Sequence, residues 1–166
     1  ATKVHELVSP MKITFMDLAA ARQVHAAAPW LNVAVSCLAN VRTPTEALWW
    51  KEQAGATHLT LSRNINRRIA KIRAFAHMDL HLSMVAFDDC IPGCQMFHRH
   101  FALPNAQNPL GRFCQDCDPA SIAVRLERPW MLAQKEVLPA HLHHYKDIIP
   151  EIKISGRDTS TDEIVR

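Results

Sequence analysis

Short segments rich in β-forming residues alternate with helical segments along the first half of the chain, and this alternation constrains the fold more than any other feature. Strands are predicted at Asn32–Cys37, Thr57–Ser62 and Leu80–Phe87, from their β-branched residues and alternating polarity. Strands that are joined through helices form right-handed βαβ units, and such units build a parallel sheet. The sequence therefore predicts an α/β fold.

Three helices are predicted before and between these strands. Asp17–Ala28 is rich in alanine and has apolar residues at helical spacing. Thr43–Glu46 has the capping-box pattern, and it predicts a helix over Pro44–Gln53 that Gly55 ends. Asn66–His77 is predicted to form a basic amphipathic helix.

The second half of the chain continues the pattern after an interruption. The segment 88–118 is rich in cysteine and proline and has no clear period, after which a helix is predicted at Pro139–Ile148 and a strand at Ile152–Ser155. A complete (β/α)8 barrel needs ~200 residues or more, whereas this chain has 166. We therefore expect residues 1–166 to form a single α/β domain or a fragment of one, with a partial (β/α) barrel-like parallel sheet that is about half of a TIM-type barrel.

Composition excludes several classes of protein. Apolar residues make up 48% of the chain, which argues against intrinsic disorder. No uncharged apolar run is long enough to span a membrane, and a net charge of +3 does not by itself predict a nucleic-acid partner. Residues Ala1–Pro10 lack the apolar core of a secretory signal, so a cytoplasmic location is expected. The chain opens on Ala and stops a few residues after a second capping-box pattern, Ser160–Glu163, so we expect an excerpt of a longer protein, with a naturally short chain as the alternative.

Four of the five cysteines lie close together, as Cys90-x3-Cys94 and Cys114-x2-Cys117. Clustered thiols in a reducing compartment indicate a metal site before they indicate disulfides. Four thiolates can hold an iron–sulfur cluster or a tetrahedral zinc ion; the alternative is four free cysteines. The fifth, Cys37, stands in an apolar segment and is expected to be a small buried residue.

Polar residues also follow the predicted strands, where parallel sheets place their binding sites. Ser62, Arg63 and Asn64 end one strand, and they are predicted to line the substrate side. Arg157 follows the last strand, where it binds either an anionic substrate group or a neighbouring acidic residue. His98 and His100 lie in the cysteine-rich segment, where they can replace a metal ligand or contact substrate.

Three stretches taken in order resemble the collagenase-like peptidase family U-32, especially its uncharacterised members with a cysteine-containing loop. They are VSCLANVRTPTEALWWKEQAGATHLTLSRNINR, DLHLSMVAFDDCIPGCQMFHRHF and HYKDIIPEIKISGRDTSTDEIVR. Within the last stretch, KISGR is similar to a signature of that family. The resemblance covers the chain from about Asn32 to Arg166.

The resemblance implies a barrel-like α/β fold and, in some relatives, a four-cysteine iron–sulfur cluster used to hydroxylate RNA bases or quinone precursors without oxygen. Cys90, Cys94, Cys114 and Cys117 match those ligand regions in order but not in spacing. The first expectation is therefore a 4Fe-4S enzyme that carries out oxygen-independent hydroxylation or a related modification. A structural zinc module and a peptidase are the alternatives. No GxSxG or HExxH motif is present.

The substrate class stays open between a small molecule, a peptide and RNA. We expect either a homo-oligomer or assembly with the remainder of a longer chain.

Overall fold

A computed structural model describes residues 11–87 and 137–154 of the chain. The strands are β1 (Lys12–Phe15), β2 (Asn32–Val35), β3 (Ala56–Thr60), β4 (His81–Phe87) and β5 (Glu151–Ile154). The helices are α2 (Leu18–Ala27), α3 (Pro44–Ala54) and α4 (Ile69–Arg73), with 3-10 helices η1 (Cys37–Ala39), η2 (Arg63–Ile65) and η5 (Pro139–His144).

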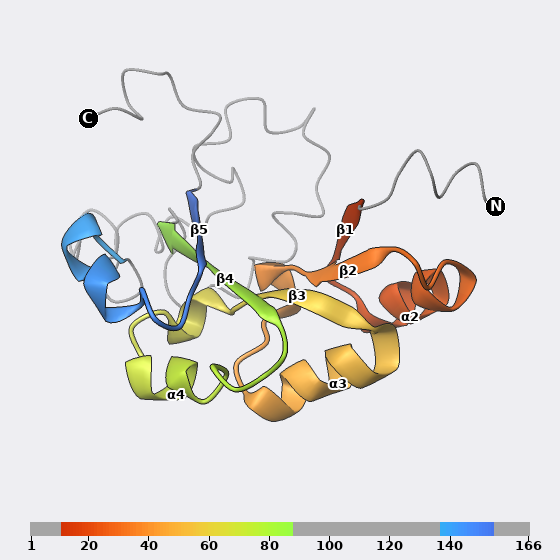
Figure 1. The fold of residues 1–166 in the computed structure, drawn as a ribbon, viewed down its shortest axis with the longest axis horizontal. Coiled ribbons are helices and arrows are strands. Elements are labelled where there is room, and N and C mark those ends of the chain that lie inside the picture. The colour runs from red at the N-terminus through yellow and green to blue at the C-terminus, as the bar shows by residue number, and fades with distance from the viewer. Residues whose placement is uncertain (1–10, 88–136, 155–166) are drawn as a thin grey trace, which may run out of the picture.

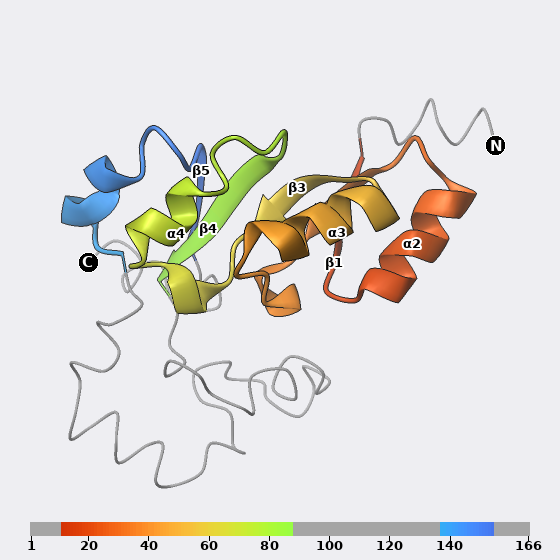
Figure 2. The same ribbon diagram turned by 90° about the horizontal axis from the view of Figure 1, so that it is seen from below.

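The five strands form one sheet in which every neighbouring pair is parallel. Their spatial order, β1-β2-β3-β4-β5, is also their order along the chain. The sheet curls strongly, and α2, α3 and α4 lie along its outer side (Figures 1 and 2). The prediction of a partial α/β barrel is therefore confirmed.

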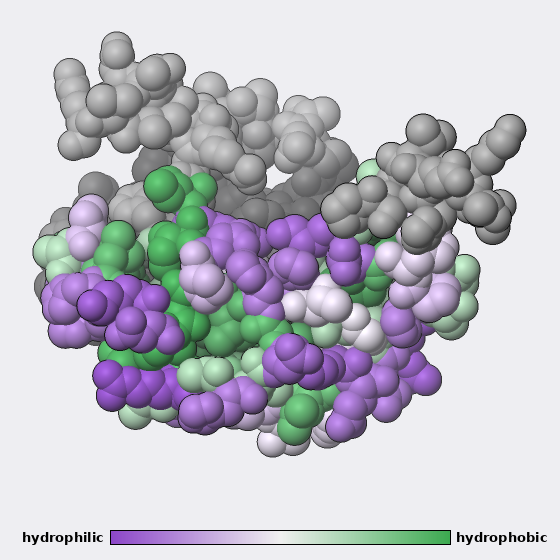
Figure 3. Space-filling model, viewed as in Figure 1, coloured by the Kyte–Doolittle hydropathy of each residue, from purple (hydrophilic) through white to green (hydrophobic). Residues whose placement is uncertain are grey.

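The hydrophobic core lies between the sheet and these helices. It contains apolar side chains of the strands, together with residues of the helices that cover them. The fully buried or nearly buried members include Val35, Leu59, Leu82, Met84, Ala47, Trp50, Ile72 and Phe75. On the opposite side of α3 and α4, hydrophilic residues cover much of the lower rim of the molecule (Figure 3). The helices thus present one face to the sheet and one to solvent.

Both α2 and α3 begin at capped residues, and the capping signals of α3 act as predicted. Asp17 Oδ1 accepts a hydrogen bond of 2.8 Å from the Ala20 N–H and begins α2. At the start of α3, the Thr43 side chain accepts from the Glu46 N–H, and the Glu46 carboxylate accepts from the Thr43 N–H. Gly55 ends α3 in the left-handed conformation, at φ 60°.

Three elements differ from the sequence prediction. β1 is an additional strand. The helix predicted at Asn66–His77 is confined to α4, because the backbone on both sides of it makes tighter i→i+3 hydrogen bonds, such as Arg68 N–H to Ile65 O and Phe75 N–H to Ile72 O. The helix predicted at Pro139–Ile148 is a 3-10 helix over the six residues of η5.

Candidate active site

Polar side chains meet at the carboxyl ends of β2 and β3, and two residues predicted to follow a strand, Ser62 and Asn64, are among them. Ser62 is 1% exposed, and its hydroxyl donates a hydrogen bond of 2.6 Å to Asn40 Oδ1. The Asn64 side chain approaches the same oxygen at 3.4 Å, and its backbone N–H donates to the Ser62 hydroxyl. Asn40 holds φ 56°, a left-handed conformation that asparagine tolerates better than most residues. The cluster therefore ties the ends of two neighbouring strands together.

The predicted members of this edge are not equally accessible. Asn64 is exposed, whereas Ser62 and Arg63 are buried, Arg63 being 9% exposed. Cys37, the first residue of η1, is half-buried and is not in a disulfide. Asn64 is therefore the residue of the predicted trio with the most surface open to a ligand.

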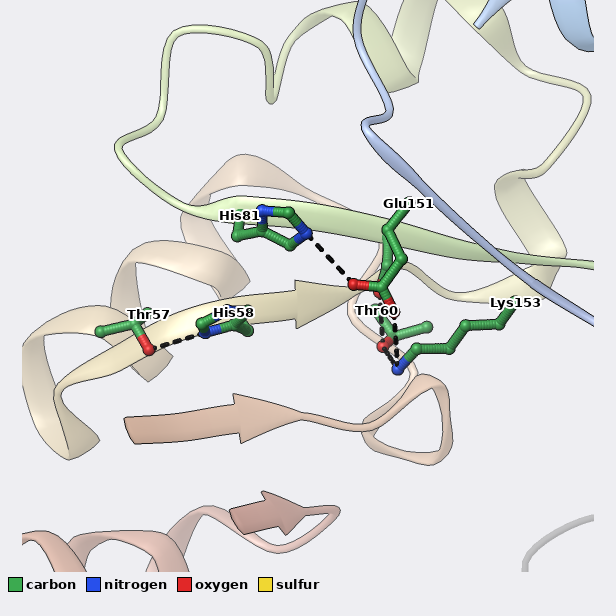
Figure 4. Close-up of polar contacts among 7 residues, drawn as sticks. Thr57, His58, Thr60, His81, Glu151 and Lys153 are labelled. Carbon is green, nitrogen blue, oxygen red and sulfur yellow. Dashed lines mark hydrogen bonds and ion pairs between the residues drawn. The ribbon is translucent and has the colours of Figure 1, made fainter. Parts of the chain in front are cut away.

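A second polar group, which sequence reasoning did not single out, lies on the sheet face opposite the helices. We call it the inner-face cluster: His58 and Thr60 of β3, His81 and Ser83 of β4, and Glu151 and Lys153 of β5. These side chains alternate with the core residues along each strand, and the parallel register sets them side by side (Figure 4).

Glu151 holds the cluster together electrostatically. His81 Nε2 lies 3.1 Å from Glu151 Oε2, and Lys153 Nζ lies 4.0 Å from the other oxygen, Oε1. The side chains of all three residues are between 35% and 42% exposed. One accessible carboxylate therefore orients an imidazole and faces an ammonium group.

Two buried hydroxyl groups, of Thr60 and Ser83, hold the Lys153 side chain in place. Its Nζ donates a hydrogen bond of 2.9 Å to Thr60 Oγ1, and Thr60 Oγ1 lies 2.9 Å from Ser83 Oγ. Thr60 is 3% exposed and Ser83 is 4% exposed. A flexible lysine is thus held at a defined place on the inner face.

His58 completes the cluster on the side of β3. Its Nδ1 lies 2.9 Å from Thr57 Oγ1, and its ring centre is 5.0 Å from that of His81. Burial lowers the pKa of His58 below its usual value, and electrostatic interaction with Lys12, His81 and Lys153 lowers it further, against the opposing effect of Glu151. His58 is therefore neutral at neutral pH.

The sequence does carry a signal for the inner-face cluster. Strands of a closed parallel barrel are usually apolar on both faces, but THLTLS, HLSMVAF and EIKIS place polar residues at alternate positions. That alternation predicts a polar sheet face. Which polar residues meet depends on the register between β3, β4 and β5.

The segment 88–136, which contains the clustered cysteines, is flanked by described residues at the carboxyl edge. β4 ends at Phe87, and the Val137 N–H donates a hydrogen bond of 2.8 Å to the Ala86 carbonyl. The described residues on either side of 88–136 therefore lie at the end of β4. The predicted ligands Cys90, Cys94, Cys114 and Cys117, together with His98, His100 and Arg157, lie outside the described residues.

Within residues 11–87 and 137–154, no group of three or more His, Cys, Asp or Glu side chains has an arrangement that could hold a metal ion. No helix in the same ranges combines the length and the apolar character that crossing a membrane requires.

Among curated proteins, the chain is similar to "Uncharacterized protease MJ1657" of Methanocaldococcus jannaschii. The two are 29% identical over 135 residues, which cover 76% of this chain. The chain spans 39% of the length of that relative. No family model matches the chain, and no solved structure matches it. The sequence-based resemblance to a peptidase family agrees with this relative, since its name is that of a protease.

Proposed function

We propose that this chain supplies the substrate-binding face of a peptidase-like hydrolase, with the inner-face cluster as its reactive centre. The observation that carries the proposal is the pair formed by His81 and Glu151, in which a carboxylate orients an accessible imidazole. Such pairs serve as general bases in many enzymes. The name of the curated relative supports peptide-bond hydrolysis as the reaction.

The proposed chemistry needs only water as co-reactant. When His81 Nε2–H donates to Glu151, the other ring nitrogen, Nδ1, keeps a lone pair that can take a proton from water. The hydroxide adds to the peptide carbonyl carbon. The proton then passes from His81 to the departing amine nitrogen as the carbon–nitrogen bond breaks.

Cleavage of casein by the full chain tests the proposal. His81→Gln should lower the rate by about 100-fold or more, the usual contribution of a general base. His77→Gln is the matched control, because His77 is exposed and lies outside the inner-face cluster. An active His81→Gln variant, or a wild-type chain that cleaves no peptide bond, would refute the proposal.

The cysteines add a metal centre to this proposal. Four thiolates in two close pairs form a donor set that fits an iron–sulfur cluster or zinc. The described residues that flank the cysteine-containing segment, Phe87 and Val137, lie at the end of β4. This favours a position of the metal near the carboxyl edge of the sheet. Cys90, Cys94, Cys114 and Cys117 would hold the metal, which supplies electron transfer as a cluster or structural bracing as zinc. Such thiolates need a reducing compartment, for which the cytoplasm is the natural choice.

Visible absorption and metal analysis of anaerobically purified protein test the metal centre. An iron–sulfur cluster absorbs visible light, and zinc does not. Replacing any of the four clustered cysteines by serine should strongly lower the bound metal, while Cys37→Ser should not. An iron–sulfur spectrum together with no peptide cleavage would favour the oxygen-independent modification chemistry instead.

A further inference from the structure

Lys153 is the residue of the inner-face cluster whose role the proposed hydrolysis leaves open. Hydrolysis uses His81 and Glu151, yet Lys153 is held beside them by Thr60. Burial of Thr60 and Ser83 makes this support rigid. A lysine fixed in this way on an accessible sheet face has lost rotamer freedom in advance, and this lowers the entropic cost of binding a partner there.

Lys153 keeps most of its hydrogen-bonding capacity. An ammonium group has three N–H donors, and within the described residues Lys153 makes one hydrogen bond, to Thr60 Oγ1. The Glu151 oxygen at 4.0 Å is an ion-pair contact, too long for a hydrogen bond. With its side chain 38% exposed, Lys153 can still donate to a ligand.

The charges around the inner-face cluster also favour an anion. Lys12 and Lys153 both act electrostatically on His58, and Glu151 is the carboxylate that acts on it in the opposite sense. That carboxylate already contacts His81 and Lys153. Among the described residues that act on His58, two lysines thus stand against one carboxylate, so positive charge exceeds negative charge around this imidazole.

We infer that Lys153 binds the C-terminal carboxylate of a peptide substrate, next to the bond that His81 would hydrolyse. This inference rests on the proposed function and adds the substrate class to it. Glu151 sets the relative position of the two groups, because its two oxygens face His81 and Lys153 respectively. A carboxylate on Lys153 therefore lies beside the imidazole, and the substrate is a peptide cut near its C-terminus.

Binding of three related peptides, which differ only in the position of a carboxylate or its absence, tests the inference by fluorescence anisotropy on the full chain. The first has a free C-terminal carboxylate, the second a C-terminal amide, and the third a C-terminal amide with an internal glutamate. We expect the wild-type chain to bind the first at least about tenfold more tightly than the other two, and added salt should weaken that preference. Equal binding of all three overturns the inference, and preference for the third assigns Lys153 to an acidic side chain instead.

Variants of Lys153 test whether this residue causes the preference for a free C-terminal carboxylate. Lys153→Met should abolish the tenfold preference, and Lys153→Arg should keep part of it, because the charge remains. Lys146→Met is the matched control, since Lys146 is exposed and lies outside the inner-face cluster. Loss of the preference in the control, or its survival in Lys153→Met, overturns the inference. If Lys153→Met does not fold, the binding of the three peptides to the wild-type chain still tests the inference.

The two proposals fail in different ways. Casein cleavage that depends on His81, together with equal peptide binding, retains the proposed function and rejects the carboxylate site. Absence of both cleavage and peptide binding rejects both.

Discussion

At the scale of single residues, Gly55 is important both for the end of α3 and for the packing of α2 on α3. It ends α3 at φ 60°, and a Cβ built on it would lie 2.2 Å from Cε1 of His25, in α2. The sequence predicts the helix end from the glycine, but the contact with the imidazole follows only from the packing of α2 on α3. Gly55 is therefore required twice, for its backbone conformation and for its lack of a side chain.

Gly55→Ala should lower the free energy of unfolding by about 2 kcal/mol, because a left-handed alanine costs about 1–2 kcal/mol and the His25 ring must also move. Urea denaturation of the full chain measures this change. In a His25→Ala background the ring is absent, so the same substitution should cost less, and the difference is the coupling between the two sites. An unchanged midpoint for Gly55→Ala would show that this description of the contact is wrong.

At the scale of elements, η5 is attached to the rest of the fold through Tyr145. This tyrosine follows η5, is 3% exposed, and donates a hydrogen bond of 2.7 Å from its hydroxyl to the Asn66 carbonyl. Asn66 in turn donates from its side chain to Val85 of β4. The short helix before β5 is thus positioned by a chain of buried hydrogen bonds, and β5 carries Glu151 and Lys153.

Tyr145→Phe should lower the free energy of unfolding by about 1–2 kcal/mol at neutral pH, because it leaves the buried Asn66 carbonyl without this donor. Burial raises the pKa of Tyr145 above 10, against the opposing charge of Arg67. The unfolded chain therefore loses this proton at lower pH than the folded chain does, and the tyrosine's contribution to stability falls as the pH rises from 10 through the folded pKa.

Denaturation curves at neutral pH and above pH 10 check both parts of this prediction. The difference in free energy of unfolding between wild type and Tyr145→Phe should shrink in alkali, because only the wild type has a tyrosine hydroxyl at this position to ionise. A difference that grows with pH would contradict the assigned direction of the pKa change.

At the scale of the whole molecule, the curled sheet is open in the part of the chain that the structure describes. In the described residues, β1 and β5 each pair with one neighbour, and Ile154 at the end of β5 is 71% exposed. Unpaired strand edges can pair with further chain segments. The curated relative is longer than this chain, which covers 39% of it, so additional sequence could supply such segments.

We expect the 166-residue chain, studied alone, to self-associate through these edges. Light scattering over a range of concentrations should give a mass above that of one chain. Ile154→Lys should reduce the association, because a charge at the edge of a sheet opposes edge pairing. Trp49→Lys is the control, since Trp49 is also exposed but lies on α3, away from both edges. A monomer at all concentrations would count against association of the open edges.

Local signals determine much of this fold. The capping box at Thr43 and Glu46 and the left-handed Gly55 act within a few residues, so the sequence predicts α3 and its ends closely. The strands β2, β3 and β4 follow from alternating polarity, and their order with the helices implies parallel pairing. The partial barrel was predictable for these reasons, and Ser62 and Asn64 were predictable as edge residues because they follow a strand.

The rest depends on contacts between distant parts of the chain. The contacts that attach η5 and the Asn66 side chain to the rest of the fold join residues 19 and 79 positions apart, which a local pattern does not encode. The inner-face cluster needs the register of three strands, and Lys153 and Thr60 meet although they are 93 residues apart in sequence. The sequence alone determined which residues alternate in polarity; only the tertiary structure decided which of them meet, because a one-residue shift in register would turn the same side chains to the other face.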